Sequence, residues 1–244
     1  MKIADGVYML ENTTGVMGQP NTVHPILIAS DDAFVLIDTG FTGQFPQLQD
    51  ALEVHEVPLE KLTDLIISHQ DLDHIGNMPE VVANAPHVRV LTHELEKPFV
   101  QGEQPLLKYD VAEVEKLPAE IPQAFKDGLI SLIKNPPQAQ VDGLLADGDV
   151  LPIAGGMTVI FTPGHTPGHL SFYLHESKIL IAADAMMVED GRLNGPAPQA
   201  TYDLALAAES LKKFTEYDVE KVVCYHGGLY EDAPNTRIRE LAGG

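Results

Sequence analysis

The sequence predicts an α/β protein with a core of two β-sheets and helices outside it. Short apolar runs with strand character recur in both halves of the 244-residue chain, and several end at a helix start or at a loop rich in histidine and aspartate. Strand and helix do not alternate regularly, which argues against a Rossmann or barrel fold. With 44% hydrophobic residues the chain can bury a substantial core, and we expect one domain over residues 1–244.

The first half predicts an antiparallel opening that passes into strand–helix units. A helix is expected over 45–54, where Phe45, Leu48 and Leu52 fall on one face. A second helix is expected after Asn77, with Asn77 as its N-cap. The strands of this half are expected at residues 6–10, 24–28, 33–37 (after a turn at 31–32), 64–67 and 88–91.

Residues 96–140 differ in character from the rest of the chain. They contain six prolines with short amphipathic pieces between them, and Phe125, Leu129, Leu132 and Ile133 fall on one helical face. About 45 residues are too few for an independent core, so we predict a helical insertion within the domain. A lid beside an active site and a packing appendage or dimer contact both fit this pattern.

The second half returns to strands, expected at 157–161, 170–174, 178–182 and 221–224. The middle two form a hairpin. Asp203 is expected to cap a helix that reaches about Tyr217.

Histidines and aspartates collect at four of the expected strand ends. If these strands share a sheet edge, the side chains converge on one point. Seven nitrogen and oxygen ligands exceed the four that a single zinc ion takes, and they suit two metal ions with a shared carboxylate. The seven residues are His69, Asp71, Asp73, His74, His165, Asp184 and His226.

Composition excludes several classes of partner. The net charge of −21 repels nucleic acid and anionic lipid surfaces, so we expect neither nucleic acid nor a membrane as partner. The chain shows no apolar run long enough for a bilayer, no signal-peptide pattern and only one cysteine, Cys224. We therefore expect a cytoplasmic protein, in which Cys224 is a buried, inert thiol.

The motifs taken together resemble the metallo-β-lactamase superfamily of hydrolases, and its lactonase-like members in particular. They are His-x-Asp-x-Asp-His at 69–74, Thr-Pro-Gly-His-Thr-Pro-Gly-His at 162–169, the later Asp184, and His226 followed by Gly227. The resemblance covers nearly the whole chain. It implies an αββα four-layer sandwich with the site on one edge of the sheets.

The resemblance also implies roles for the seven residues. His69, Asp71 and His165 would hold a first metal ion, and Asp73, His74 and His226 a second. Asp184 would bridge the two ions, with a hydroxide between them as the nucleophile. Asp73 and Asp184 are the predicted catalytic residues. Zinc is the expected metal, with manganese and iron as alternatives.

One position departs from the family pattern. Asp71 stands where a second histidine is usual, which lowers the net charge of a site with two dications from +2 to +1. More oxygen ligation favours harder ions. In a second interpretation Asp71 points away, and the first metal position is weak or empty.

We expect hydrolysis of a small-molecule ester or lactone, and a homodimer. The alternatives are a thioester hydrolase of the glyoxalase II kind, and a di-iron redox or ligand-sensing protein without hydrolytic turnover. Three supporting expectations follow: Asp38 orders the ligand loop through hydrogen bonds, His169 bonds a loop instead of a metal, and His93 is a weak candidate for a similar role. A further hypothesis is an apolar substrate pocket, although for each residue taken singly ordinary core packing is the favoured interpretation. The residues concerned are Leu106, Leu107, Tyr109, Met186, Met187 and Leu193.

Overall fold

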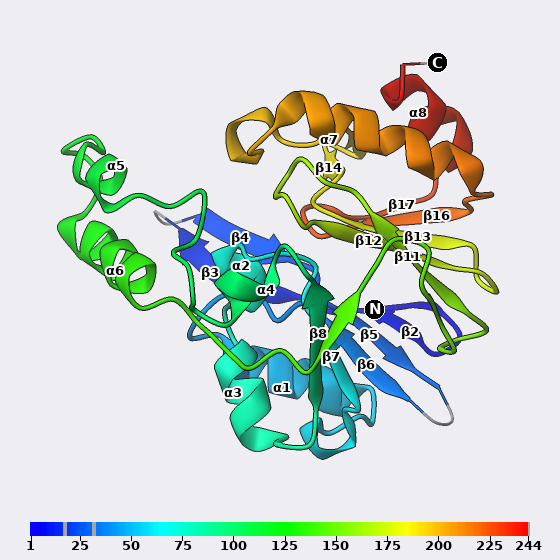
Figure 1. Ribbon diagram of the computed structural model, residues 1–244, viewed down its shortest axis with the longest axis horizontal. Coiled ribbons are helices and arrows are strands. Elements are labelled where there is room, and N and C mark those ends of the chain that lie inside the picture. Colours follow the sequence, from blue (N-terminus) through cyan, green and yellow to red (C-terminus); the bar gives the residue numbers. More distant parts are fainter. Residues whose placement is uncertain (17–18, 31–32, 244) are drawn as a thin grey trace.

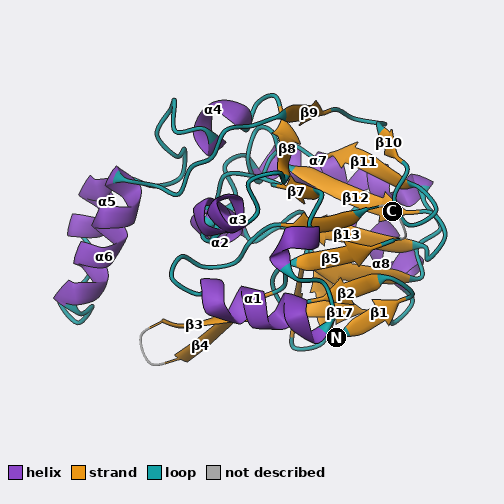
Figure 2. Cartoon of the chain, turned by 90° about the horizontal axis from the view of Figure 1, so that it is seen from below, coloured by secondary structure: helices purple, strands orange, loops and turns teal. Residues whose placement is uncertain are grey.

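The computed structural model describes residues 1–16, 19–30 and 33–243. Two β-sheets stack face to face and helices cover their outer faces, so the molecule has the four αββα layers of the metallo-β-lactamase fold (Figures 1 and 2). The turn expected at residues 31–32 lies outside the described residues. No helix in the described ranges is long and apolar enough to cross a membrane.

The first sheet has the strand order β1-β2-β5-β6-β7-β8-β9. Its strands pair antiparallel from β1 to β6 and parallel from β6 to β9. Their bounds are β1 Lys2–Ala4, β2 Val7–Met9, β5 Ile26–Ala29, β6 Phe34–Ile37, β7 Asp64–Ile66, β8 Arg89–His93 and β9 Gly143–Leu145.

The second sheet has the order β10-β11-β12-β13-β16-β17, antiparallel throughout except for the parallel pair β13 and β16. Its strands are β10 Val150–Leu151, β11 Met157–Phe161, β12 Leu170–Leu174, β13 Ile179–Ala183, β16 Lys221–Cys224 and β17 Gly228–Tyr230. Two hairpins stand outside the sheets: β3 Asn12–Val16 with β4 Gln19–Val23, and β14 Met187–Glu189 with β15 Arg192–Asn194.

Helices α1 Phe45–Val54 and α3 Met78–Asn84 lie over the first sheet, and α7 Leu204–Ser210 and α8 Pro234–Leu241 over the second (Figure 1). Single helical turns form α2 Leu72–Ile75 and α4 Lys97–Val100, and 3-10 helices span Leu59–Lys61, Pro198–Ala200 and Leu211–Glu216. The segment predicted as a helical insertion contains α4, α5 Val111–Glu115 and α6 Gln123–Lys134. In both views α5 and α6 stand away from the sandwich.

Apolar side chains fill the space between the sheets and the space under each helical layer. Val35 and Ile37 of β6 enter the core between the sheets, whereas Leu36 enters the core under α1 and α3. In β12, Phe172 faces the first sheet and Tyr173 faces the helices over the second. Because both faces of each sheet are covered, the central strands are uninterrupted apolar runs in the sequence.

The strand ends that carry the predicted site residues meet at one edge, but they belong to both sheets. The first sheet contributes the loops after β6 and β7, and the second those after β11, β13 and β16. Two of these ends turn through left-handed residues, Asp38 with φ 61° and Ala183 with φ 45°. The pairing of β13 with β16 shifts register between Ile181 and Ala183. Such irregularities re-aim the chain at strand ends.

Several expectations are confirmed to the residue, including the helix over 45–54 and the strands at 157–161 and 221–224. The helix after Asp203 becomes 3-10 beyond Ser210. Asn77 is the N-cap residue of α3, as expected, but its side chain makes no capping bond and donates instead to the Thr39 carbonyl, at 2.6 Å.

Gly76 should tolerate no side chain, because it ends α2 directly against the loop after β6. An added Cβ would overlap the backbone at Gly40, Phe41 and Thr42. We expect Gly76→Ala to destabilise the fold by about 1–3 kcal/mol, as overpacking does. Urea unfolding measures this.

Gly128→Ala is the matched control, because Gly128 lies inside α6 with nothing within 4 Å of its added Cβ. It should stabilise by up to about 1 kcal/mol. Equal unfolding midpoints for wild type and Gly76→Ala would contradict the close packing of these two loops.

Candidate metal centre

The structure brings all seven predicted site residues together, in two adjacent groups. Within each group, potential ligand atoms lie within 4.8 Å of one another. The first group is His69, Asp71, His165 and Asp184, and the second is Asp73, His74 and His226.

In the first group, Asp71 Oδ2 lies 3.3 Å from His69 Nε2 and 3.0 Å from His165 Nε2. Asp184 Oδ2 lies 3.3 Å from the same His165 nitrogen. Both carboxylates are buried, with side chains 8% and 9% exposed. Asp71 therefore points into the cluster, contrary to the interpretation in which it turns away.

In the second group, His226 Nε2 lies 3.2 Å from Asp73 Oδ2. Asp184 reaches this group as well, with Oδ2 3.4 Å from His226 Nε2 and Oδ1 3.5 Å from His74 Nε2. Asp184 thus lies between the two groups, where a shared ligand would be placed. The second group is the more open one, because the His226 side chain is 34% exposed.

A buried carboxylate, Asp38, orders the loop after β7. Its Oδ1 accepts from the Ser68 backbone N–H at 2.8 Å, and its Oδ2 accepts from Ser68 Oγ at 2.6 Å and lies 2.8 Å from His74 Nδ1. With Nδ1–H bonded to Asp38, His74 turns Nε2 toward the cluster. This is the loop-ordering role expected for Asp38.

His169 takes the outer position expected for it. Its Nδ1 lies 2.8 Å from Thr162 Oγ1, and its Nε2 accepts from the Asp184 backbone N–H at 3.1 Å. Burial holds the pKa of His169 well below its ordinary value, which suits a neutral ring that donates at one nitrogen and accepts at the other. His169 therefore fixes the backbone that presents Asp184.

Glu96 joins the two ligand-bearing loops, a role that sequence reasoning missed. It is fully buried. Its Oε2 accepts from the backbone and side-chain nitrogens of Gln70, and its Oε1 accepts from Thr166 Oγ1 and the Gly168 N–H. Gln70 follows His69, and Thr166 follows His165. The sequence shows Glu96 only as an acidic residue at the start of the proline-rich insertion, and such a residue is expected to be exposed. Nothing in the sequence therefore pointed to its buried role.

Lys108 is the second missed residue. Its ammonium forms an ion pair with Asp71 and lies 2.8 Å from His165 Nε2. It comes from the insertion, far in sequence from either motif, so spacing offered no clue. His93, by contrast, stacks on Phe161 with ring centroids 4.4 Å apart and takes no part in the cluster.

The residues present fit metal ions. His69 Nε2, His74 Nε2 and Asp184 Oδ1 are buried and have no hydrogen-bond partner among the described residues. Burial lowers the pKa of His69 to about 4, so its ring is neutral and offers a lone pair. Burial also lowers the pKa of His226, but the negative charges and hydrogen bonds of Asp184 and Asp73 have the larger effect and raise it to about 10. Unpaired buried nitrogens beside crowded carboxylates are costly unless a cation joins them.

Two cavities adjoin the cluster. One, of about 370 Å³, is lined by His165, Asp184 and His226 together with Met186 and Met187. The other, of about 510 Å³, reaches Asp73 and includes Tyr109. Leu106 and Leu193 are buried in the core under the helical layers, the interpretation favoured for each of them singly, and so they do not belong to the hypothesised pocket. Cys224, the last residue of β16, is fully buried between the second sheet and the helices that cover it, as expected.

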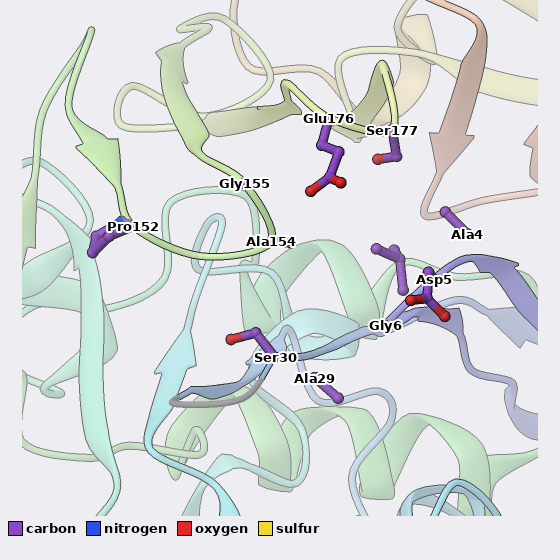
Figure 3. Close-up of a pocket in the computed structure, with 11 residues that line it drawn as sticks. Ala4, Asp5, Gly6, Ala29, Ser30, Pro152, Ala154, Gly155, Glu176 and Ser177 are labelled. Atoms are coloured by element: carbon purple, nitrogen blue, oxygen red, sulfur yellow. The ribbon is translucent and has the colours of Figure 1, made fainter.

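A third cavity, of about 650 Å³, lies at the opposite ends of the strands (Figure 3). Ser30 comes from the connection before β6, and Glu176 and Ser177 from the turn before β13, two strands that lead to the cluster. None of the seven predicted site residues lines it.

A family model described as the metallo-beta-lactamase superfamily matches residues 18–226. The chain belongs to this superfamily. Membership accounts for the two-sheet fold and for the position of the His/Asp cluster. Since curated relatives are described as probable metallo-hydrolases, the protein is a probable metal-dependent hydrolase.

The superfamily relatives differ in how much of the chain they match. The chain is 28% identical over 225 residues to the probable metallo-hydrolase YflN of Bacillus subtilis, covering 87% of this chain and 83% of that one. A solved metallo-beta-lactamase family protein from Thermus thermophilus superposes with a TM-score of 0.71 at 23% identity, covering 99% of this chain and 80% of the other.

Two relatives match in part only. A hydroxyacylglutathione hydrolase of a Chelativorans species is 37% identical over 113 residues, 42% of each chain. An N-acyl homoserine lactonase of Bacillus thuringiensis is 29% identical over 96 residues, 38% of this chain and 37% of that one.

Glu96→Gln should destabilise the protein by about 1–3 kcal/mol. An amide cannot accept at both ends, and the backbone N–H groups of Gln70 and Gly168 cannot turn away, so one buried donor loses its acceptor. Urea unfolding of the protein measures the change.

Glu94→Gln is the control, because Glu94 lies two residues away and is exposed. It should stay within about 0.5 kcal/mol of wild type. If the two variants unfold alike, Glu96 does not tie the loops together.

Proposed function

We propose that the protein hydrolyses a small-molecule ester or lactone with the help of two divalent metal ions, zinc in the first instance. The observation that carries the proposal is the pair of ligand groups sharing Asp184 at the junction of two open cavities. A hydrolytic site needs both reactive groups and room for substrate on either side of the scissile bond.

The chain's own residues supply position and electrostatics. Asp71, Asp73 and Asp184 place three carboxylates among four histidines, and Asp38, His169 and Glu96 hold the backbone that presents them. Metal ions bound there would ionise a water molecule near neutral pH and polarise a carbonyl oxygen. Because such a water molecule would serve as the nucleophile, no serine or cysteine nucleophile is needed, and Cys224 is too buried to act as one.

The larger of the two cavities supports a substrate with an apolar limb. Its walls are the face of α6 carrying Phe125, Leu129 and Leu132, the β3–β4 hairpin, and Phe41. Asp73 lies in the same cavity, so an acyl chain against α6 would place its carbonyl near the cluster. The insertion thus serves as a wall of the substrate site.

The names of the relatives support hydrolysis of a carboxylic ester bond without settling which one. A lactonase matches over part of the chain, and so does a thioester hydrolase that is more identical over its span. Ester or lactone comes first, because the described residues that line the two cavities include no lysine or arginine to hold an acidic thiol carrier such as glutathione. Thioester hydrolysis is the second candidate.

Zinc-loaded protein should hydrolyse members of a panel of nitrophenyl esters, lactones and thioesters, and chelation should abolish turnover. Asp184→Asn should lower both metal content and kcat/KM, the latter by more than about 100-fold, because it removes the ligand common to both groups. Mass spectrometry of bound metal and initial-rate assays measure the two effects.

Asp190→Asn is the control, since Asp190 is exposed and its left-handed conformation, φ 50°, suits asparagine. It should keep its metal and its activity. Full metal content in Asp184→Asn, or no turnover of any class by metal-loaded wild type, would reject the proposal.

Chain length should matter if α6 holds an apolar limb. We expect kcat/KM to rise with acyl length, and Leu129→Asn to reduce it about 10-fold or more for long chains while leaving short-chain esters unchanged, because several buried CH₂ contacts are lost. Leu206→Asn on α7, exposed and outside both cavities, is the control. Equal losses for short and long chains would remove α6 from the substrate site.

A further inference from the structure

The ammonium of Lys108 lies inside the first ligand group. It pairs with Asp71 Oδ2 and lies 2.8 Å from His165 Nε2 and 2.7 Å from the Ala200 carbonyl oxygen. The side chain is 14% exposed. A lysine with three acceptors and little contact with water is held in place, unlike the freely moving lysines of a protein surface.

The backbone around Lys108 is anchored on both sides to the loop that carries the ligands. The Leu107 N–H donates to Gln70 Oε1 at 2.8 Å, and Tyr109 Oη accepts from the Leu72 N–H at 3.3 Å. Gln70 is itself held by Glu96. The segment therefore delivers its lysine to Asp71 through contacts that do not depend on the ammonium.

The two ligand groups differ in whether a lysine ammonium contacts their ligand atoms. Asp71 Oδ2 and His165 Nε2 are the atoms that a first metal ion would need, and the ammonium contacts both. In the second group, the ion pairs of Asp73, His74 and His226 among the described residues involve only histidines and carboxylates. Among the described residues, the first position thus holds a lysine ammonium, and the second holds none.

We propose that Lys108 is the resident cation of the first ligand group and makes the two metal positions unequal. The second position fills first, and the first fills only when the ammonium withdraws from Asp71 and His165. The inference rests on the proposed metal site but not on the hydrolytic reaction.

The charges favour this arrangement. Asp71 adds a negative charge to a crowded acidic cluster, and a buried carboxylate without a partner is costly, so the ammonium stabilises the metal-free protein. A dication entering the first position must break that pair and is repelled by the ammonium while it stays nearby. Within the described residues, no lysine ammonium has to withdraw from the second position.

The test is a metal titration of the apoprotein with Zn²⁺ against a chromophoric chelator, and with Co²⁺ followed by its visible absorbance. Wild type should bind one ion tightly and a second at least about tenfold more weakly. Lys108→Met should tighten the weaker site by about tenfold or more, because the competing ion pair is gone. Lys108→Arg keeps a cation and should leave that site weak, which separates charge from side-chain loss.

Lys116→Met is the matched control, a lysine of the same insertion paired with Glu113 on the surface. It should titrate like wild type. Two equal sites in wild type, or a weaker or unchanged site in Lys108→Met, would overturn the inference. If Lys108→Met does not fold, Lys108→Gln carries the same expectation. Unequal sites without turnover would reject the hydrolase alone, and turnover with equal sites would reject this inference alone.

Discussion

The packing of the two sheets against each other is the constraint on which the site depends, since neither sheet carries a complete set of ligands. The first sheet presents His69, Asp71, Asp73 and His74, and the second presents His165, Asp184 and His226. Phe172 and its neighbours fill the space between the sheets and set their distance and angle. Metal ligands must be placed to within fractions of an ångström, so this apolar contact serves the polar cluster directly.

Buried carboxylates then refine what the sheets bring together. Asp38 orients His74, and Glu96 joins the loop of Gln70 to the loop of Gly168. Each accepts from backbone N–H groups for which the described part of the chain offers no backbone acceptor, so each bond is expensive to lose. These bonds order loops that have no helix or strand structure of their own.

The sequence predicts the chemistry of the centre better than its surroundings. The His/Asp motifs are local, and apolar runs locate the strands that carry them. The β3–β4 hairpin escaped notice, because Asn12–Val16 and Gln19–Val23 are rich in polar residues and lack the alternation that marks a strand. Glu96 and Lys108 escaped because their roles come from residues far away in the chain. A charged residue in a proline-rich segment looks like a solvated one until the fold brings its partners to it.

The insertion stands apart from the sandwich, yet α6 forms one wall of the larger cavity at the cluster. Its groove-facing residues, such as Phe125 and Leu129, are absent from the three apolar cores that stabilise the fold. Substitutions there can reshape the cavity at little cost in stability, because few core contacts are at stake. If α6 forms a wall of the proposed substrate site, substitutions that change specificity and substitutions that change stability fall on different parts of this chain, and α6 is the place to begin laboratory evolution of specificity.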